Sequence, residues 1–485
     1  MDIEAQSASN ALMWFRNDLR VTDNQALSLA VEWAAKHNAG LEAVYFQTPN
    51  QWQQHDVAPI QLDFIERHLN LLGDALAKIG IKLRIIKLDR FDQIANELTA
   101  FCRQHSIKKI FAGAEPEWNE IQRDKNIASS GLAIHFTQEH CLLEPLTVKN
   151  QSGQMFKVFT PFKRRWREIA AQLAIYPLSK PTTLYSPQAF KPIILNCEKI
   201  SSKAWPAGES AAQQLLNRFS QQSLARYKDN RDFPALNATS QLSPYLAIGV
   251  LSPRQCFAAI LAQYPSALVE ETDADVWLNE LIWREFYRHL LVAFPRLSKT
   301  KNFNSKYDVV VWRNDPHEFQ LWCEGKTGYP IIDAAMRQLN QTGWMHNRLR
   351  MITASFLTKH LLIDWRWGER YFRQHLIDGD LAANNGGWQW SAGTGCDAQP
   401  YFRIFNPMEQ SKKFDANGDF IRHFLPELID VPAKKLHQSN NKTENLIETN
   451  YSISKNYPVA IVEHKFARAR ALEAFAILKS NHSLG

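Results

Sequence analysis

Short apolar runs alternate with amphipathic segments over the first 140 residues of the 485-residue chain. Five runs are short, apolar and bounded by polar residues, a pattern that predicts buried strands at 11–15, 41–46, 81–88, 107–112 and 132–136. Segments with helical periodicity lie between them at 25–36, 60–79 and 91–105. Strands and helices in this order predict a doubly wound parallel sheet.

The turn after the first predicted strand reads RNDLRVTDN, residues 16–24. A dinucleotide site on such a sheet normally carries the glycine pattern G-x-G-x-x-G at this turn, and it is missing here. We therefore expect no standard dinucleotide site. Thr22 or Asp23 is expected to cap the following helix, because short oxygen-bearing side chains accept hydrogen bonds from the first free N–H groups of a helix.

After Gly208 the periodicity becomes helical and no convincing strand remains. Helices are predicted at 209–220, 252–263, 273–292, 330–340, 344–361, 365–375 and 464–479. The domains expected are an α/β domain (1–140), a proline-rich connection (141–207) and a larger all-α domain (208–485). Within the connection, KVFTPFKRRWRE (157–168) is interpreted as a solvated helix face. The Asn- and Ser-rich segment 436–456 is expected to be a surface excursion.

Composition narrows the class of protein. With 45% hydrophobic and 22% charged residues the chain is an ordinary globular protein, and no apolar run is long enough to cross a membrane. Six cysteines without a CxxC pair, and no secretory signal, favour a cytoplasmic protein without a metal site. Lys plus Arg exceeds Asp plus Glu by 56 − 49 = 7, which permits a polyanionic partner. Fifteen tryptophans suggest stacking or redox use besides packing.

Two predicted helices carry polar residues on faces that otherwise look buried. On the first, the stripe has spacings of 3, 4, 3 and 4 and consists of Trp277, Glu280, Arg284, Tyr287 and Leu291. Glu280 and Arg284 either pair with each other at i,i+4 or line a polar cavity. On the second, a face after Gly343 consists of Trp344, Asn347, Met351 and Ser355, with Arg348 and Arg350 beside it. A buried Asn must find hydrogen-bond partners, so this face also suggests a site.

Two further stretches are rich in candidate chemistry. Thr239, Ser240 and Ser243 cluster before Pro244, where hydroxyls and backbone N–H groups either cradle a phosphate or simply make a good turn. Residues 377–407 combine acids, amides, glycines and large aromatic rings, which suits a grip on a flat heteroaromatic ring. The alternative for that stretch is an aromatic-rich, irregular core loop. Signatures of hydrolysis, phosphoryl transfer and zinc chemistry are missing from the sequence.

Five segments together resemble motifs of the DNA photolyase/cryptochrome family. They are WFRNDLR (14–20), KVFTPFKRRW (157–166), WLNELIWREFYRHLL (277–291), EGKTGYPIIDAAMRQLNQTGWMHNRLRM (324–351) and LIDGDLAANNGGWQW (376–390). The resemblance covers nearly the whole chain and is strongest to the bacterial class I enzymes that act on cyclobutane pyrimidine dimers. It implies a light-dependent carbon–carbon lyase of DNA repair, in which excited, reduced FAD donates an electron to the dimer and recovers it after ring opening.

The resemblance also implies residue roles. FAD would be bound by Tyr227, Thr239, Ser240, Gln241, Leu242, Ser243, Trp277, Arg284, Arg350, Asp378, Gly379, Asp380 and Asn384. Glu280 would stabilise the dimer radical anion, Asn384 would face flavin N5, and Trp388, Trp365 and Trp312 would pass electrons inward. Dimer or DNA contacts would come from Arg231, Glu280, Trp283, Tyr287, Asn347, Arg348, Met351, Trp390 and Arg403. A 5,10-methenyltetrahydrofolate antenna would use His55, Asn119, Glu120 and Lys299.

Within this family, Asn347 and Met351 stand where (6–4) photolyases carry histidines, which favours the cyclobutane lesion. A cryptochrome that senses blue light without repair is the alternative function. The expected partner is single- or double-stranded DNA carrying pyrimidine dimers, and the expected state is a monomer in the bacterial cytosol, associated with the nucleoid when bound to DNA, with no membrane contact.

Overall fold

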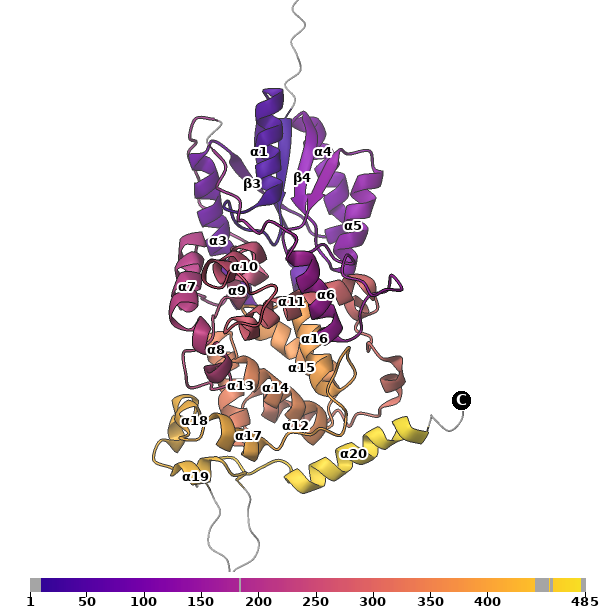
Figure 1. Ribbon diagram of the computed structural model, residues 1–485, viewed down its shortest axis with the longest axis vertical. Helices are drawn as coiled ribbons and strands as arrows, with labels where there is room; N and C mark the ends of the chain where they lie inside the picture. The colour runs from indigo at the N-terminus through magenta and orange to yellow at the C-terminus, as the bar shows by residue number, and fades with distance from the viewer. Residues whose placement is uncertain (1–9, 183–184, 441–452, 454–456, 481–485) are drawn as a thin grey trace, which may run out of the picture. The chain divides into compact units, whose positions relative to one another are not determined.

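The computed structural model of the protein describes residues 10–182, 185–440, 453 and 457–480, with side chains except those of 477–480. The chain forms two compact units, which Figure 1 shows coloured along the sequence. The first unit comprises Met1–Ala225, Ser240–Pro295 and Ile377–Gly379. The second unit comprises Arg226–Thr239, Arg296–Leu376 and Asp380–Gly485. Among the described helices, none combines the length and hydropathy that a bilayer span requires.

A five-stranded parallel sheet lies at the centre of the first unit. Its order is β3-β2-β1-β4-β5, with β1 Asn10–Phe15, β2 Gly40–Gln47, β3 Lys82–Lys87, β4 Ile107–Gly113 and β5 Ile134–Thr137. The helices between the strands are α1 Gln25–His37, α2 Pro49–Gln54, α3 Pro59–Lys78, α4 Ile94–Gln104 and α5 Trp118–Ser129. The strand order reverses between β1 and β4, so the prediction of a doubly wound parallel sheet is confirmed.

The loop from Arg16 to Asn24 corrects one expectation. The N-cap of α1 is Asn24, whose side chain accepts a hydrogen bond from Leu27 N at 2.9 Å, so the prediction of Thr22 or Asp23 was wrong. Asp23 has a left-handed φ of 57° and its carboxylate serves another purpose. It accepts hydrogen bonds from Ser252 Oγ, from Arg254 Nη1 at 2.5 Å and from Leu178 N at 2.8 Å. Asp23 therefore ties three distant segments of the first unit together.

A buried carboxylate occupies the start of α1, where a nucleotide-binding sheet would place a phosphate. Glu139 accepts hydrogen bonds from Ala26 N at 3.1 Å, from Thr137 Oγ1 at 2.8 Å and from Arg20 Nη2. The side chains of Arg20 and Glu139 are 1% and 0% exposed. Because an internal anion already neutralises this helix end, the arrangement accounts physically for the missing dinucleotide motif.

Five helices complete the first unit: α6 Phe159–Ala170, α7 Glu209–Gln222, α9 Ser243–Ala247, α10 Pro253–Gln263 and α11 Asp275–Ala293. On α6, Phe159, Phe162 and Trp166 are buried at helical spacing, while Arg164 and Arg165 are exposed. The interpretation of 157–168 as a solvated face therefore holds for the basic side only. The opposite, aromatic side packs into the unit.

The second unit contains no strand within its described residues and is built from helices and turns. They are α8 Tyr227–Asn230, η3 Leu297–Lys299, η4 Ser305–Val309, α12 Pro316–Cys323, α13 Pro330–Thr342, α14 Asn347–Ser355, η5 Phe356–His360, α15 Trp365–His375, α16 Leu381–Ala392, α17 Pro407–Phe414, α18 Asp419–Phe424, η6 Pro426–Leu428, α19 Ala433–Leu436 and α20 His464–Ser480. Together with the sheet of the first unit, this confirms the predicted α/β part followed by an all-helical part.

The prediction of a helix at 344–361 is wrong at its start, whereas helical structure continues to His360, close to the predicted end. The helix begins only at Asn347, because the side chain of His346 caps it by accepting from Arg348 N at 3.2 Å. Trp344 therefore precedes the helix and does not share a helical face with Asn347. Beyond Ser355 the α-helix gives way to one π-helical turn, Phe356–His360.

Two other segments differ from the sequence-based picture. Residues 381–392 form the regular helix α16, which neither alternative for that stretch included. Residues 436–440 are not a surface excursion, because Leu436, His437 and Asn440 are 0%, 5% and 3% exposed. The rest of that excursion lies outside the described residues, apart from Ile453.

Asn440 fastens the two ends of this segment. Its Oδ1 accepts from Ile453 N at 2.9 Å, and its Nδ2 donates to Tyr457 O and Pro458 O at 2.8 and 2.9 Å. Its backbone also bonds to Gly328 O and Ala460 N at 3.0 and 2.8 Å. One amide side chain thus joins Asn440 to Ile453, Tyr457 and Pro458.

Candidate cofactor and DNA sites

Helix α16 begins with the acid and amides that the sequence singles out. Asp380 caps the helix by accepting from Ala383 N at 2.8 Å. In the first turn, the amide of Asn384 donates to the backbone carbonyl of Glu369 on α15 at 2.9 Å. This hydrogen bond therefore fixes the orientation of the Asn384 side chain. A side chain that binds one particular ligand atom needs such a fixed orientation.

Two glycines shape the surface and packing of α16. A Cβ at Gly387, one turn beyond Asn384, would meet no atom within 4 Å, so this part of the helix surface is bare. A bare helix surface beside a fixed amide fits a flat ring such as the FAD isoalloxazine. On α15, a Cβ at Gly368 would lie 2.1 Å from Trp388 Cη2 and 2.6 Å from Leu357 Cδ2. Gly368 thus makes room for the Trp388 indole between the two helices.

The three tryptophans predicted for electron transfer belong to one aromatic region of the second unit. Trp388 and Trp365 are 2% and 0% exposed in its core, and Trp312 packs against the same core while partly exposed. Trp388 contacts Phe372 edge-on at 4.9 Å, and Trp365 donates from Nε1 to Asn302 Oδ1 at 2.9 Å. Trp312 meets Phe475 of α20 edge-on at 5.9 Å. The structure therefore places these indoles in a gradient from buried to partly exposed.

A buried polar chain behind Asn384 was not predicted. Asn385 Nδ2 donates to the Glu369 carboxylate at 2.9 Å, and Gln389 Nε2 donates to Asn385 Oδ1 at 2.8 Å. Gln389 in turn accepts from Phe303 N at 2.7 Å. Burial raises the pKa of Glu369 to about 7. The only sequence signal is the i,i+4 spacing of Asn385 and Gln389, since Glu369 lies on another helix.

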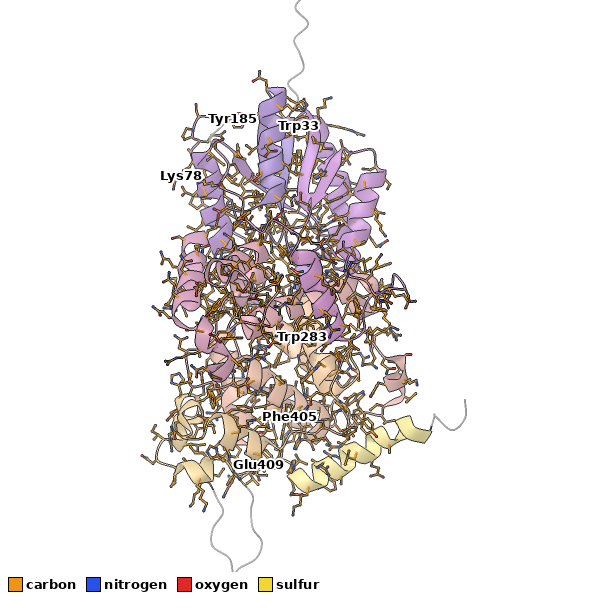
Figure 2. The ribbon with its side chains drawn as sticks, viewed as in Figure 1. Trp33, Lys78, Tyr185, Trp283, Phe405 and Glu409 are labelled. Carbon is orange, nitrogen blue, oxygen red and sulfur yellow. The ribbon has the colours of Figure 1, made fainter. Side chains whose placement is uncertain are left out.

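In the first unit, α11 carries the predicted stripe. Trp277 is 3% exposed and packs on Phe219, with ring centroids 4.9 Å apart, and Leu291 is 2% exposed. Glu280 and Tyr287 are partly exposed. Trp283, labelled in Figure 2, stacks face to face on Phe159 with ring centroids 3.7 Å apart and planes 8° apart. The rings of α11 are therefore supported from behind by α6.

Arg284 and Glu285 anchor α11 within the first unit. Arg284 donates to His140 O at 2.5 Å and to Leu246 O at 3.1 Å, so its guanidinium is engaged with backbone carbonyls. Glu285, which the sequence-based search missed, accepts from Trp166 Nε1 at 2.7 Å and from Leu142 N. Burial raises the pKa of Glu285 to about 7. These bonds fix the helix that presents Glu280.

Other predicted cofactor residues are divided between the two units. In the first unit, Ser240, Gln241 and Leu242 precede the short helix α9, which begins at Ser243, and Gln241 has a left-handed φ of 52°. Asp378 and Gly379 are buried in the same unit. The carbonyl of Gly379 accepts a hydrogen bond from Gln61 Nε2 at 2.9 Å. In the second, Thr239 is partly exposed and Tyr227 is 8% exposed. Arg350 there donates to Met345 O at 2.8 Å.

Predicted DNA-contacting residues gather at the start of α14 in the second unit. Arg348 forms an ion pair with Asp232, Nη2 to Oδ2 at 2.7 Å, and its guanidinium lies 4.4 Å from the ring centroid of Phe414. Arg231 Nε lies 3.7 Å from Asp232 Oδ1. Asn347 is exposed at the first position of the helix. Sequence reasoning missed Asp232, which follows Arg231 directly but belongs to the same cluster as Arg348, 116 residues later.

Trp390 and Arg403 lie apart from this arginine cluster in sequence. Trp390 is partly exposed on α16, and Arg403 is exposed in the turn that follows Pro400.

The predicted antenna residues are divided between the two units. His55 and Asn119 are exposed in the first unit, and Lys299 is exposed in the second. Glu120 is partly buried and accepts from Gln51 Nε2 at 3.0 Å. Burial, reinforced by the nearby carboxylate of Glu115, raises the pKa of Glu120 to about 7. No cluster of three or more possible metal ligands occurs among the described residues.

Comparison with known proteins decides the family. Residues 11–199 match the family model described as DNA photolyase, and residues 277–477 match the FAD binding domain of DNA photolyase. The chain is 46% identical to a Vibrio cholerae protein named deoxyribodipyrimidine photo-lyase, covering 96% of this chain and 99% of that one. The chain belongs to the DNA photolyase family. The family resemblance and the expectation of FAD as a cofactor are therefore confirmed.

Further relatives agree with this. The Escherichia coli deoxyribodipyrimidine photo-lyase is 46% identical over 96% of this chain and 98% of its own. A crystal structure of a class III photolyase from Agrobacterium tumefaciens superposes with a TM-score of 0.82 at 35% identity, covering 99% of this chain and 100% of the other. A Synechocystis cryptochrome structure gives a TM-score of 0.82 at 29% identity, covering 96% and 99%.

Proposed function

We propose that this photolyase-family protein repairs DNA in the light by splitting cyclobutane pyrimidine dimers with an electron from its flavin. Relatives named deoxyribodipyrimidine photo-lyase share 46% identity with the chain, whereas the cryptochrome structure shares 29%, so the light-sensing alternative is not favoured. The structural observation that carries the proposal is the gradient from buried Trp388 and Trp365 to partly exposed Trp312. Oxidisable indoles that share one core, two of them buried and one partly exposed, suit a protein that recharges a redox cofactor.

The predicted FAD contacts come from residues of both units. When bound, reduced FAD would supply the light-excited electron for ring opening. Asn384, held by the Glu369 carbonyl, would orient toward the flavin ring on the bare surface at Gly387. The remaining FAD contacts would be the predicted residues Tyr227, Thr239–Ser243, Trp277, Arg284, Arg350 and Asp378–Asp380.

Lesion binding would use side chains that leave hydrogen-bonding or stacking surfaces partly exposed. Glu280 would hydrogen-bond the carbonyl edge of the dimer and stabilise its negative charge while the ring opens. Trp283 and Trp390 would offer flat apolar walls to a nucleotide that has left the base stack. Asn347, Met351 and Tyr287 would complete the dimer contacts, and Arg231, Arg348 and Arg403 would bind phosphates.

The finer properties follow from the same proposal. The substrate would be a dimer in single- or double-stranded DNA, because the proposed contacts reach the lesion and its flanking phosphates. The protein would act as a monomer in the cytoplasm and bind the nucleoid through damaged DNA. A methenyltetrahydrofolate antenna would use His55, Asn119, Glu120 and Lys299. Loss of an additional, non-flavin absorption band in Glu120→Ala would support that antenna, and an unchanged spectrum would reject it.

The decisive experiment measures repair of a dimer-containing oligonucleotide by the FAD-loaded protein under near-UV or blue light and in the dark. Repair is expected only in the light. Trp312→Phe should abolish photoreduction of oxidised flavin, followed by absorbance, but should leave repair by chemically reduced protein within about twofold of wild type. Dark repair, or no light-dependent repair with fully reduced flavin, would overturn the proposal. Loss of repair in chemically reduced Trp312→Phe would reject the electron-transfer role of that residue.

A further inference from the structure

The arginine cluster at the start of α14 contains an acid with no assigned role in the proposed reaction. Asp232 Oδ2 pairs with Arg348 Nη2 at 2.7 Å, and Asp232 Oδ1 lies 3.7 Å from Arg231 Nε. One carboxylate thus lies between two guanidinium groups that the proposed function assigns to DNA phosphates. A phosphate would need the same donors, so the carboxylate and the DNA backbone compete for them.

Exposure shows that this ion pair can be exchanged. The side chains of Arg348 and Asp232 are 17% and 32% exposed, unlike the buried pair of Arg20 and Glu139 at 1% and 0%. An ion pair this accessible to water contributes little net free energy to folding. A phosphate that arrives with its own charge can therefore displace Asp232 at small cost.

The remaining donors of Arg348 are incompletely satisfied. Its Nη1 lies 3.8 Å from Met351 Sδ, and thioether sulfur is a weak acceptor. Its Nε is buried and has no hydrogen-bond partner in the part of the chain that the structure describes. The guanidinium is nevertheless held in place by the ring of Phe414, at 4.4 Å. Arg348 is thus positioned and retains donor capacity for a stronger acceptor.

Met351 connects this arginine to the proposed dimer contacts. Its sulfur lies 3.9 Å from Asn347 Nδ2 and 3.8 Å from Arg348 Nη1, so one thioether touches both side chains. In the proposed function, Asn347 and Met351 touch the dimer. A dimer that moves the flexible Met351 side chain would remove this thioether contact of Arg348, so occupation of the lesion site would alter the surroundings of the Asp232–Arg348 pair.

We propose that Asp232 is a specificity-determining residue, which holds Arg348 away from the backbone of undamaged DNA and releases it to a phosphate when a dimer occupies the lesion site. This inference rests on the proposed repair function. It adds a reason why the protein binds dimer-containing DNA in preference to undamaged DNA. Undamaged DNA would bind with the Asp232–Arg348 pair intact. Dimer-containing DNA would gain one phosphate contact, because the lesion contacts offset the cost of opening the pair.

Salt dependence measures this difference directly. Each phosphate contact changes the slope of log K against log salt by about 0.9 for duplex DNA. For the FAD-loaded wild-type protein in the dark, the slope for a duplex with one cyclobutane dimer should be steeper by about one unit than that for the same duplex undamaged. Fluorescence anisotropy at several NaCl concentrations gives both slopes.

The test variant is Asp232→Asn, which keeps the shape and removes the charge. Its slope for undamaged DNA should steepen to the dimer value, and its affinity for undamaged DNA at low salt should rise about three- to tenfold, as expected for one freed charged donor. Asp229→Asn, an exposed acid on α8, makes the same change of net charge and should leave the slope unchanged. Asp232→Glu, which keeps the carboxylate, should retain the wild-type slopes.

Three outcomes would overturn the inference: an unchanged slope for undamaged DNA in Asp232→Asn, weaker binding of both duplexes, or an equal effect of Asp229→Asn. The steeper salt slope for undamaged DNA must also vanish when Asp232→Asn is combined with Arg348→Gln. If the steeper slope persisted in the double variant, Arg348 would not be the released group. These binding slopes are measured in the dark. Absence of light-dependent repair by wild type would therefore defeat the proposed function without deciding the competition between Asp232 and phosphate.

Discussion

Both units place arginines beside acids, but at very different depths. In the first unit, Arg20 and Glu139 are 1% and 0% exposed, and each makes further hydrogen bonds to backbone groups. In the second, Arg348 and Asp232 are 17% and 32% exposed, and Arg348 keeps unused donor capacity. A fully buried pair has no solvent to replace a lost partner, whereas a partly exposed pair can exchange its partner for a ligand. Depth therefore separates charges that hold the fold from charges available for binding.

The largest effect is expected from breaking the buried pair. Glu139→Gln should lower the free energy of unfolding of the first unit by about 3–5 kcal/mol, because it leaves the Arg20 guanidinium buried without its counter-charge. Hydrogen exchange of the β1 and α1 amides reports on this unit. As a control, Glu168→Gln removes the exposed partner of Arg165, 50% and 51% exposed, and should cost less than about 0.5 kcal/mol. Similar losses in the two variants would show that burial does not set the difference.

The second effect concerns pH. Burial, together with the adjacent Glu139 carboxylate, raises the pKa of Asp18 from 3.8 to about 6. The folded protein thus holds this proton more tightly than the unfolded chain, so the stabilisation is complete below pH 3.8 and is lost as pH rises toward 6. Asp18→Asn should remove this fall, at most about 3 kcal/mol for two pKa units. Urea titrations of the first unit from pH 4 to 7 measure it.

Asp74→Asn provides the matched control, since it removes a carboxyl group that is 49% exposed on α3. It should keep the wild-type dependence on pH, because it leaves the buried Asp18 carboxyl unchanged. An unchanged pH dependence in Asp18→Asn would contradict the buried role of Asp18.

The smallest stability effect is expected in the second unit. Arg348→Gln should change the free energy of unfolding by less than about 1 kcal/mol, since its pair is partly exposed. The same change should weaken binding of dimer-containing DNA about tenfold, through loss of a charged hydrogen bond. Thermal unfolding and anisotropy measured on one preparation separate the two quantities. A large loss of stability with normal DNA binding would show that the Arg348–Asp232 pair, like the Arg20–Glu139 pair, serves the fold and not binding.

The elements that the sequence predicted well are those whose own composition specifies them. The five strands are short apolar runs, and helices such as α13 and α15 have strong amphipathic periodicity. Helix α16 was not predicted because Asn384–Gly387 is unfavourable for a helix in isolation. Its amides bond to Glu369, and Trp388 fits the space left by Gly368, so contacts with α15 override the local preference.

The candidate site shows the same limit. The motifs carried by family resemblance gave the residues that would face FAD and the dimer, and their roles stay predictions. The supporting residues Glu285, Glu369 and Asp232 were missed, because each acts on a partner from a distant segment or another helix. The N-cap of α1 was predicted wrongly for a related reason, because several neighbouring polar residues suit a cap. Asp23 bonds to Ser252 instead, and Asn24 caps the helix.

The bonds of Asn440 limit which side chain position 440 can carry. Its amide accepts from Ile453 N at 2.9 Å and donates to Tyr457 O and Pro458 O at 2.8 and 2.9 Å, so it serves as donor and acceptor at once. A buried polar group that loses its hydrogen-bond partner costs roughly 1–3 kcal/mol. A side chain that can only donate or only accept would therefore leave at least one of these backbone groups unsatisfied.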